Sequence, residues 1–419
     1  MARTLDVHLH TGLVGHLRQD DDGDLSFQYA KSWLQRKGAV PLSHSLPLRA
    51  ERFRRKECRG FFAGILPEES KRETIARNLG ISARNDYAML ERIGGECAGA
   101  VTFVPHGEPL PDRDYGYRKL SDEELAAILK DLPRRPLLAG EEGIRLSLAG
   151  AQDKIAIRIE EGAICLPLGG APSTHILKPN VERFAGVVFN EAYCMQLAAA
   201  AGLPAATVEI REAAGISFLL AKRYDRSQRP EPDGASVVER LHQEDFCQAL
   251  GIVSEHKYQK EGGPSLKQCF GLMREVSSAP VIDLAQLLDA VVFNYIVGNN
   301  DAHGKNYSLL YRPGGGELEI RLAPLYDVVS TVYYPELSRD MAMRIGGQYS
   351  SERVTLRDFE ILAEDARLGK PLVRARLTEI AERVREALPE VPVANPVSEN
   401  VAELIRRRTE KALQVFRGR

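Results

Sequence analysis

Four side chains between positions 301 and 327 are of the types that phosphoryl transfer uses. Asp301, His303 and Asn306 offer a carboxylate, an imidazole and a carboxamide within one short stretch, and Asp327 supplies a second carboxylate further along the chain. In such a site one acid accepts the proton of the attacking hydroxyl, while the amide and the other acid hold Mg²⁺ on the phosphates. Hard oxygen ligands suit this ion, which neutralises charge where the phosphoryl group passes. The pattern therefore predicts a kinase.

The elements on either side of these residues are expected to hold them in one loop. Residues 287–297 are apolar on most faces, which predicts a buried helix. Residues 307–311 have the composition of a strand. The chemistry-bearing loop should therefore lie at the mouth of a core helix.

A nucleotide-binding half is predicted upstream of this loop. Residues 173–179 form an apolar strand pattern with Lys178 just before a proline, where a lysine can reach a nucleotide phosphate. A helix is expected from residue 189 to Gly202, and Glu191 in its first turn could pair with Lys178. An unrelated surface lysine and glutamate are the alternative. Residues 216–225 run from an apolar strand into a hinge whose backbone could contact an adenine edge.

The segments around this half lead to plainer expectations. Residues 145–159 have strand-like ends around a turn of small residues, where backbone amides can approach phosphate oxygens. The segment lacks the second glycine and the Lys-Ser/Thr pair of a Walker A loop, so alone it predicts a hairpin with a structural turn. Residues 226–236 should form a surface loop or a linker between lobes. From residue 239 onward the pattern is mostly helical, with His242 at a helix entry.

Length and composition limit the class of protein. At 419 residues the chain is expected to hold two or three compact units. A hydrophobic content of 44%, a charged content of 27% and a net charge of −2 are typical of a soluble globular protein rather than a general polyanion binder. The six cysteines have no CxxC spacing, so neither a zinc site nor a disulfide framework is indicated. No signal region and no apolar run of membrane-spanning length is evident, which predicts a cytoplasmic protein.

Three other clusters leave alternatives open. His8, His10 and His16 lack a carboxylate or cysteine companion at ligand spacing, so exposed strand-face residues are favoured over a metal site. The basic cluster at residues 52–59 predicts a solvated face or contact with an acidic or nucleic-acid partner. The helical stretches 356–388 and 396–419 are also basic, and their intervening acids favour salt-linked surface helices over contact with a phosphate backbone.

Four segments, taken in order, resemble the motifs of one family: residues 147–154, 174–178, 240–248 and 300–306. Together they closely resemble the HipA family, the kinase toxins of HipBA-type toxin–antitoxin modules. The resemblance covers nearly the whole chain. Asp153 departs from the glutamate familiar in the family, and the segment between Lys178 and Glu191 is shorter than in related proteins.

The resemblance implies roles for individual residues. Asp301 matches the general base, and Asn306 and Asp327 match the Mg²⁺ ligands. Ser147 matches the serine that these kinases autophosphorylate, which ejects the phosphate loop and silences the enzyme. The implied ATP-binding residues are Ala149, Gly150, Ala151, Gln152, Asp153 and Lys154 of the phosphate loop, the phosphate-binding Lys178, Lys222, Arg223 and Tyr224 of the adenine hinge, and His303 and Tyr326 of the nucleotide pocket.

The expected fold class is α+β, a protein-kinase-like two-lobe fold with an extra small α+β N-terminal module. We expect this N-terminal subdomain at residues 1–105, a linker helix and β-rich nucleotide-binding lobe at 106–240, and a helical catalytic lobe at 241–419, with ATP between the last two. The resemblance implies an ATP- and Mg²⁺-dependent serine/threonine kinase toxin that phosphorylates a translation factor such as an aminoacyl-tRNA synthetase. It also implies a HipB-type DNA-binding antitoxin, repression of the operon by the complex, and no membrane partner. A nucleotide-binding co-repressor with little kinase activity is the alternative, and a small-molecule kinase is a third hypothesis.

Overall fold

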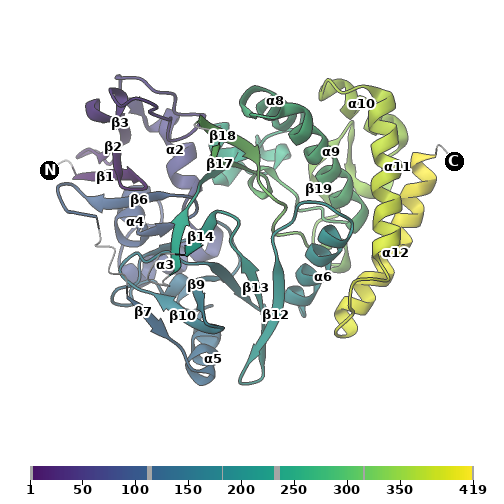
Figure 1. The fold of residues 1–419 in the computed structure, drawn as a ribbon, viewed down its shortest axis with the longest axis horizontal. Helices are drawn as coiled ribbons and strands as arrows, with labels where there is room; N and C mark the ends of the chain where they lie inside the picture. Colours follow the sequence, from purple (N-terminus) through teal and green to yellow (C-terminus); the bar gives the residue numbers. More distant parts are fainter. Residues whose placement is uncertain (1–2, 111–115, 182, 231–235, 315–316, 418–419) are drawn as a thin grey trace. The chain divides into compact units, whose positions relative to one another are not determined.

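The computed structural model describes residues 3–110, 116–181, 183–230, 236–314 and 317–417, and it divides into two compact units (Figure 1). The first unit holds Met1–Pro179, Arg211–Glu255 and Leu310–Arg312. The second holds Asn180–Ile210, His256–Leu309 and Pro313–Arg419. Each unit is therefore built from segments that are separate in sequence. The predicted boundaries at residues 105 and 240 are not tested by this division and stay predictions.

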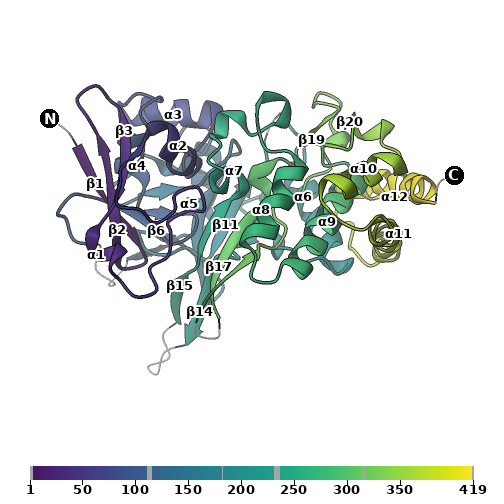
Figure 2. The same ribbon diagram turned by 90° about the horizontal axis from the view of Figure 1, so that it is seen from above.

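The first unit begins with an antiparallel sheet in the order β4-β3-β2-β1-β6, of which β1, β2, β3 and β6 are labelled in Figure 2. Alternation along β1 places Leu5, Val7 and Leu9 in the core, as the strand pattern predicted. The elements of this part are β1 Arg3–Leu9, β2 Gly12–Gln19, β3 Leu25–Tyr29, α1 Lys31–Leu34, β4 Phe53–Arg54, α2 Arg55–Gly64, α3 Glu69–Leu79, α4 Asp86–Ile93 and β6 Val101–Pro105.

The expectation that the N-terminal histidines have no carboxylate companion is wrong. The register of β1 and β2 places His16 directly opposite Asp6, and His16 Nδ1 lies 2.7 Å from Asp6 Oδ1. The companion comes from the neighbouring strand, so spacing along one strand could not indicate it.

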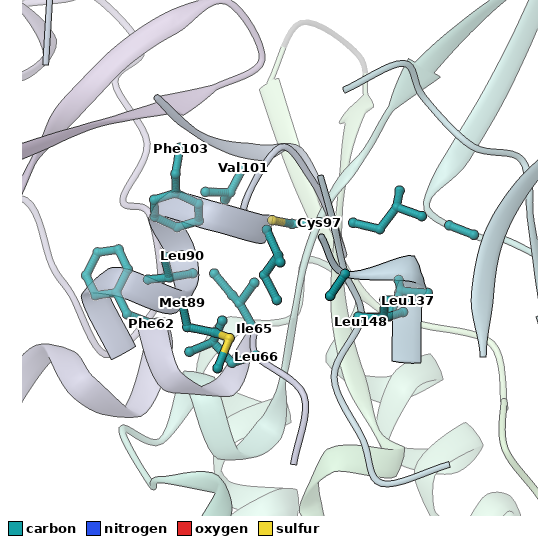
Figure 3. Close-up of a cluster of buried hydrophobic side chains, with 14 of the residues drawn as sticks. Phe62, Ile65, Leu66, Met89, Leu90, Cys97, Val101, Phe103, Leu137 and Leu148 are labelled. Atoms are coloured by element: carbon teal, nitrogen blue, oxygen red, sulfur yellow. The ribbon is translucent and has the colours of Figure 1, made fainter. Parts of the chain in front are cut away.

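A second antiparallel sheet of the first unit has the order β12-β13-β11-β9-β10-β7. The hairpin predicted for residues 145–159 is wrong, because β8 pairs in parallel with β5 while β9 pairs with β10 and β11. Leu137 and Leu148 are buried in the same apolar cluster as Cys97 and Phe62 (Figure 3), and burying them holds β8 against β5. The elements are β5 Glu96–Cys97, β7 Tyr117–Lys119, α5 Asp122–Asp131, η1 Pro136–Leu138, β8 Leu146–Ser147, β9 Ile155–Glu160, β10 Ala163–Pro167, β11 His175–Pro179, β12 Val208–Ala213 and β13 Ile216–Lys222.

Two expectations for the chain after β13 are also wrong. A hairpin of β14 (Arg226–Pro230) and β15 (Ser236–Arg240) replaces the predicted surface loop, of which residues 231–235 lie outside the described structure. The strand β16 (His242–Asp245) follows, and the helix is limited to α7 (Phe246–Ala249). His242 is buried with its Nε2 2.9 Å from the Leu42 carbonyl, rather than at a helix entry. Pairing with distant strands overrode the local helical pattern.

The second unit is mainly helical. Its elements are α6 Val187–Ala200, η2 Ser254–His256, η3 Gln259–Glu261, α8 Leu266–Val276, α9 Pro280–Val297, η4 Gly304–Asn306, β17 Ser308–Gly314, β18 Glu317–Leu322, η5 Thr331–Tyr333, β19 Asp340–Ile345, β20 Gln348–Ser350, η6 Ser351–Arg353, α10 Leu356–Asp365, α11 Lys370–Ala387 and α12 Pro396–Phe416. The first two residues of η2 and the middle of β17 (Leu310–Arg312) belong to the first unit, and the first three residues of β12 belong to the second. The two predicted C-terminal helical stretches and the break near Gly369 are confirmed.

Helix α9 is the core helix that the sequence predicted. Among the described residues, α9 is the one helix that is long and apolar enough to cross a membrane. The expectation that no apolar run approaches membrane-spanning length is therefore wrong. It is nevertheless 72% buried within the protein, where it packs against α8, α11 and α12. A helix that is apolar all round and covered by other helices is what the centre of a globular unit requires.

Surface charges and cysteines follow the sequence-based expectations. The basic C-terminal helices carry ion pairs such as Arg376 with Asp289 and Arg408 with Glu352, as expected for salt-linked surface helices. Contact with nucleic acid is not tested by these pairs. All six cysteines are buried free thiols, and burial raises the pKa of those at positions 58, 97, 194 and 269 to about 12. They act as small apolar side chains.

Candidate functional site

The catalytic loop, residues 298–306, begins where α9 ends. Gly298 closes the helix with φ 73°, a left-handed conformation that favours glycine. Buried amides then fix the first turn: Asn299 Nδ2 donates to Asn294 Oδ1 over 2.9 Å, and Asn294 Nδ2 donates to the Tyr307 hydroxyl over 3.1 Å. The two ends of the loop are thus joined to one side chain of the core helix, and the segment between them is held in a single shape.

Three of the predicted site residues lie on this loop. Asp301 is exposed, while His303 and Asn306 are buried on either side of the short 3-10 turn η4. The His303 backbone N–H donates to Asn306 Oδ1 over 3.1 Å, which orients the carboxamide. The Tyr258 hydroxyl donates to Asp301 Oδ1 over 2.8 Å, and the Tyr258 ring meets the His303 ring edge-on at 5.4 Å. The carboxylate that a substrate could reach therefore has one oxygen already positioned.

Asp327 is brought to the same loop by the residues beside it. The Tyr326 hydroxyl donates to the Lys305 carbonyl over 2.6 Å, so the side chain just before Asp327 reaches the backbone just before Asn306. On the other side, the Asn300 backbone N–H donates to Thr331 Oγ1 over 2.8 Å. Both flanks of Asp327 are therefore tied to the catalytic loop.

The backbone of Asp327 has an uncommon conformation. Its φ of 58° lies in the left-handed region, which non-glycine residues adopt rarely and mainly as Asn or Asp. Such conformations persist where the surroundings impose them, and they cluster at functional sites. Here a buried pair of bonds supplies the constraint, since Asn190 Nδ2 donates to the Ser330 carbonyl and Asn190 Oδ1 accepts from the Ser330 N–H.

The donors offered by this cluster suit Mg²⁺. Asp301 and Asp327 offer carboxylate oxygens, and Asn306 Oδ1 keeps a second lone pair beyond the one that accepts from His303. An all-oxygen set with few protein ligands is what Mg²⁺ takes when phosphates and water complete its shell. A pocket lined by Leu203, Pro204, Pro324 and neighbours adjoins Asn306 but contains neither aspartate, so we do not assign it to the nucleotide.

The phosphate loop, residues 149–154, belongs to the first unit. Gly150 has φ 108°, and a Cβ there would approach Lys154 Nζ to 2.7 Å, so the position requires glycine. Lys154 Nζ donates to the Ala149 carbonyl over 2.6 Å, and the Glu68 N–H donates to the Gly150 carbonyl over 3.2 Å. In a trans peptide the N–H points opposite to the carbonyl, so the amides of Gly150 and Ala151 point away from these donors. That orientation leaves them suited to an anion.

Two further contacts hold the phosphate loop and the strand β8 just before it. Asp153 is buried and forms an ion pair with Lys71 of α3 at 2.6 Å. Ser147 is fully buried in β8, where its hydroxyl donates to the Ile65 carbonyl over 3.0 Å. No phosphate fits at that hydroxyl while β8 keeps its place, because a group carrying nearly two charges would lie in an apolar cluster.

Lys178 and the hinge lie on neighbouring strands of the first unit. Lys178 is buried on β11, opposite Leu219 of β13. The Arg223 N–H donates to the Thr174 carbonyl over 3.0 Å, so its backbone faces β11. Backbone groups alternate along a strand, which turns those of Lys222, the last residue of β13, toward the other edge, while Tyr224 lies in the turn that follows. Of residues 222–224, the backbone of Lys222 is therefore the one that the strand orients for the expected adenine contact.

The side chain of Arg223 is committed to a buried charge network. Arg223 and Arg226 both bond to Glu96 and Asp225. Burial alone would raise the pKa of both carboxyls, but the arginine charges outweigh it and hold the pKa of Glu96 and of Asp225 below their usual values. The network joins β5, which pairs with the strand of Ser147, to the hinge.

Sequence patterns missed several of the residues that shape these sites. Tyr258 and Asn190 are remote in sequence from the loops they contact, and neither lies in a motif. Lys71, which pairs with Asp153, lies outside every motif that the sequence indicated. A lone exposed aspartate next to an apolar helix gives no sign of which hydroxyl will contact it. The Lys178–Glu191 pair joins residues of different units and stays a prediction, although each residue is buried.

The chain is similar in sequence to proteins of one family. The family models described as HipA N-terminal domain and HipA-like C-terminal domain match residues 5–104 and 146–391. The chain is 48% identical over 396 residues to "Putative kinase Y4mE" of Sinorhizobium fredii, covering 93% of this chain and 92% of that protein. It is 31% identical over 409 residues to "Serine/threonine-protein kinase toxin HipA" of Shewanella oneidensis, covering 94% and 91%.

A solved structure resembles the whole chain. It is the Shewanella oneidensis MR-1 toxin–antitoxin system HipA, HipB and operator DNA complex, with a TM-score of 0.85, 28% identity, and coverage of 99% of this chain and 98% of that one. The α+β fold expected from the sequence is thereby confirmed.

Proposed function

The chain belongs to the HipA family of serine/threonine-protein kinases, and on that premise we propose that it is the ATP- and Mg²⁺-dependent kinase toxin of a toxin–antitoxin module. The observation that carries the proposal is the attachment of both flanks of Asp327 to the loop of Asp301 and Asn306. Two carboxylates and a carboxamide held this way are the donor set that phosphoryl transfer needs.

Asp301 acts as the general base. Its exposure lets the serine hydroxyl of a protein substrate approach, and the hydrogen bond from Tyr258 to Oδ1 leaves Oδ2 to accept the hydroxyl proton. Since one oxygen is already oriented, little side-chain freedom is lost when the substrate binds.

Asn306 and Asp327 hold the metal. Bound Mg²⁺ would neutralise the charge on the phosphates. The constrained backbone at Asp327, with φ 58°, supports this role because it limits the positions that the carboxylate can take. His303 and Tyr326 border this pair and line the nucleotide pocket.

The first unit supplies the remaining contacts to ATP. The backbone amides of residues 149–154 bind the phosphates, with Gln152 part of the same loop, and Lys178 adds a positive charge positioned by Glu191. The backbone of Lys222 and Tyr224 binds the adenine edge. Arg223 fixes the hinge through its ion pairs.

Ser147 is the site of autophosphorylation. Because its hydroxyl is buried and bonded to Ile65, phosphate transfer requires β8 to leave its place beside β5. A phosphoserine cannot return there without burying its charge, so the modified phosphate loop stays displaced and the kinase is silenced.

The biological setting follows from the family. The relative in the solved complex is bound with HipB and operator DNA. We assign this chain a HipB-type antitoxin, shared repression of the operon, a cytoplasmic location and a translation factor, such as an aminoacyl-tRNA synthetase, as its protein substrate.

The test is transfer of label from γ-labelled ATP. Wild-type protein should label Ser147 and an added substrate, Asp301→Asn should lose about 10²–10⁴-fold in rate, and Ser147→Ala should label the substrate alone. The exposed Glu336→Gln, also in the second unit, is the matched control and should retain full activity. Absence of label from wild type under all metal conditions, with nucleotide binding and operator repression intact, would favour the co-repressor instead.

A further inference from the structure

Three ligand-type side chains of the N-terminal sheet converge on one point outside the kinase sites. Asp6 lies on β1, His16 on β2, and His106 follows β6. His16 Nδ1 lies 2.7 Å and His106 Nδ1 lies 2.8 Å from Asp6 Oδ1, and one ligand atom from each residue falls within 4.8 Å of the others. The two imidazoles approach edge to face, with centroids 5.3 Å apart, so their Nδ1 atoms can point to a shared position.

We propose that Asp6, His16 and His106 form a binding site for a divalent transition-metal ion of the Zn²⁺ class. Two imidazole nitrogens and one carboxylate oxygen are a donor set that Zn²⁺ accepts, with water or an external group in the remaining position. The hard-oxygen set of the kinase site is of a different type, so the two sites should select different ions.

The surroundings of Asp6 are those of a metal-binding carboxylate. The Gly107 N–H donates to Asp6 Oδ2 over 3.2 Å and fixes the group, while Oδ1 faces the two imidazoles. Outer contacts of this kind orient ligands in known metal sites. Burial would raise the pKa of Asp6, but its hydrogen bonds with His106, Gly107 and His16 outweigh burial and lower the pKa, so the carboxyl stays ionised.

A metal fits with a small adjustment. Tetrahedral bonds of roughly 2.0–2.1 Å separate neighbouring ligand atoms by about 3.3 Å, so the present contacts must widen by about half an ångström. His106 can supply its part of that movement, since its side chain is 62% exposed and lies beyond the end of β6. The strand register fixes the backbones of Asp6 and His16, so their contact widens by rotation of the side chains, of which that of His16 is 22% exposed.

Metal binding would cross-link three segments of the sheet. Asp6, His16 and His106 lie on strand β1, on its partner β2, and just past its other neighbour β6. An ion that binds the folded sheet and not the unfolded chain must stabilise it. The exposed side of His106 leaves the remaining coordination position open to solvent.

The experiment titrates the full-length protein with Co²⁺, a spectroscopic probe for Zn²⁺ sites, in excess Mg²⁺ to occupy the kinase site. Wild type should develop the visible absorption of nitrogen-bound Co²⁺ at one ion per chain, and Zn²⁺ should displace it. His106→Asn and Asp6→Asn should each lower the affinity by at least about tenfold. The control is His10→Asn, because His10 is exposed at the end of the same strand and Asn tolerates its φ of 55°.

A second measurement guards against a variant that simply misfolds. Zn²⁺ should raise the thermal midpoint of wild type and of His10→Asn, but not that of His106→Asn. Without metal, the midpoint of His106→Asn should stay close to that of wild type, because His106 is exposed. Wild type without a Co²⁺ band would overturn the proposal and leave a hydrogen-bonded His–Asp–His cluster. Equal binding by wild type, His106→Asn and Asp6→Asn would overturn it as well.

Discussion

The catalytic loop of the second unit and the phosphate loop of the first unit are held by different kinds of bond. Neutral amides and hydroxyls fix the catalytic loop, as in the contacts of Asn294 with Asn299 and of Asn300 with Thr331. The phosphate loop depends on an ion pair, Lys71 with Asp153, and on a serine hydroxyl.

The difference matches what each loop must do. Neutral buried bonds keep their strength when a charged nucleotide arrives, so the base and the metal ligands stay in place. An ion pair beside a phosphate site competes with the incoming charge, and a single added phosphate can break it. In the proposed mechanism, the chemistry lies on the loop held by neutral bonds, and the regulation lies beside the loop held by an ion pair.

Beyond the loss expected for Asp301→Asn, a large effect is expected at Asp327. Asp327→Asn keeps a residue that tolerates φ 58° but removes a negative charge from the metal site. Affinity for ATP with Mg²⁺ should fall by about 10–100-fold, by analogy with the loss of a supporting group in metal sites. Affinity for ATP in EDTA should not change, and isothermal titration under both conditions would measure this. Equal losses with and without the metal would show that Asp327 supports the fold rather than the ion.

A pH effect is expected where the first unit buries a lone carboxyl. Glu244 bonds to Ser43, to the His44 N–H and to Tyr311, and burial raises its pKa to about 7 against the lowering effect of these bonds. Between pH 4.5 and about 7, the folded state keeps a proton on Glu244 that the unfolded chain has released. The stabilisation that is fully present below pH 4.5 is therefore lost as the pH rises through about 7.

Glu244→Gln removes that dependence. Wild type should lose up to a few kcal/mol of unfolding free energy between pH 5 and pH 8 relative to the variant. Urea unfolding followed at several pH values is the measurement, with the exposed Glu51→Gln as the control in the same unit. Parallel pH curves for wild type and Glu244→Gln would mean that the Glu244 carboxyl titrates normally.

The sequence predicted the parts of the site whose spacing is local. Asp301, Asn306 and the helix before them are separated by a few residues, so one pattern covers the helix, the turn and the ligands. It failed where a distant partner decides the structure. β16 was expected to be helical, but it is a strand because its hydrogen-bonding partners are remote in sequence. Tyr258 gave no signal because its contact with Asp301 exists only in the folded chain.

A smaller effect tests the charge that holds the phosphate loop. Lys71→Met removes the ion pair with Asp153 while keeping the length and packing of the side chain. A partly buried pair of this kind contributes on the order of 1 kcal/mol, so β8 should leave its place more often and Ser147 should be phosphorylated several-fold faster. The time course of Ser147 labelling measures this, with Lys71→Arg as the matched control. A slower or unchanged rate would mean that Lys71 does not restrain the loop.

A further effect is expected from the Tyr258 hydroxyl, which donates to the proposed base Asp301. Tyr258→Phe removes the hydrogen bond to Asp301 Oδ1 but keeps the ring that packs against His303. A bond of about 1.5–3 kcal/mol to a charged group corresponds to a loss of roughly 10–150-fold. This loss should appear in kcat with KM for ATP unchanged, because the carboxylate acts on the attacking hydroxyl. Tyr333→Phe, on η5 of the same unit, is the control and should be neutral. A rise in KM for ATP with kcat intact would place Tyr258 in nucleotide binding and would remove the argument that the rigid loop prepares the base before substrate arrives.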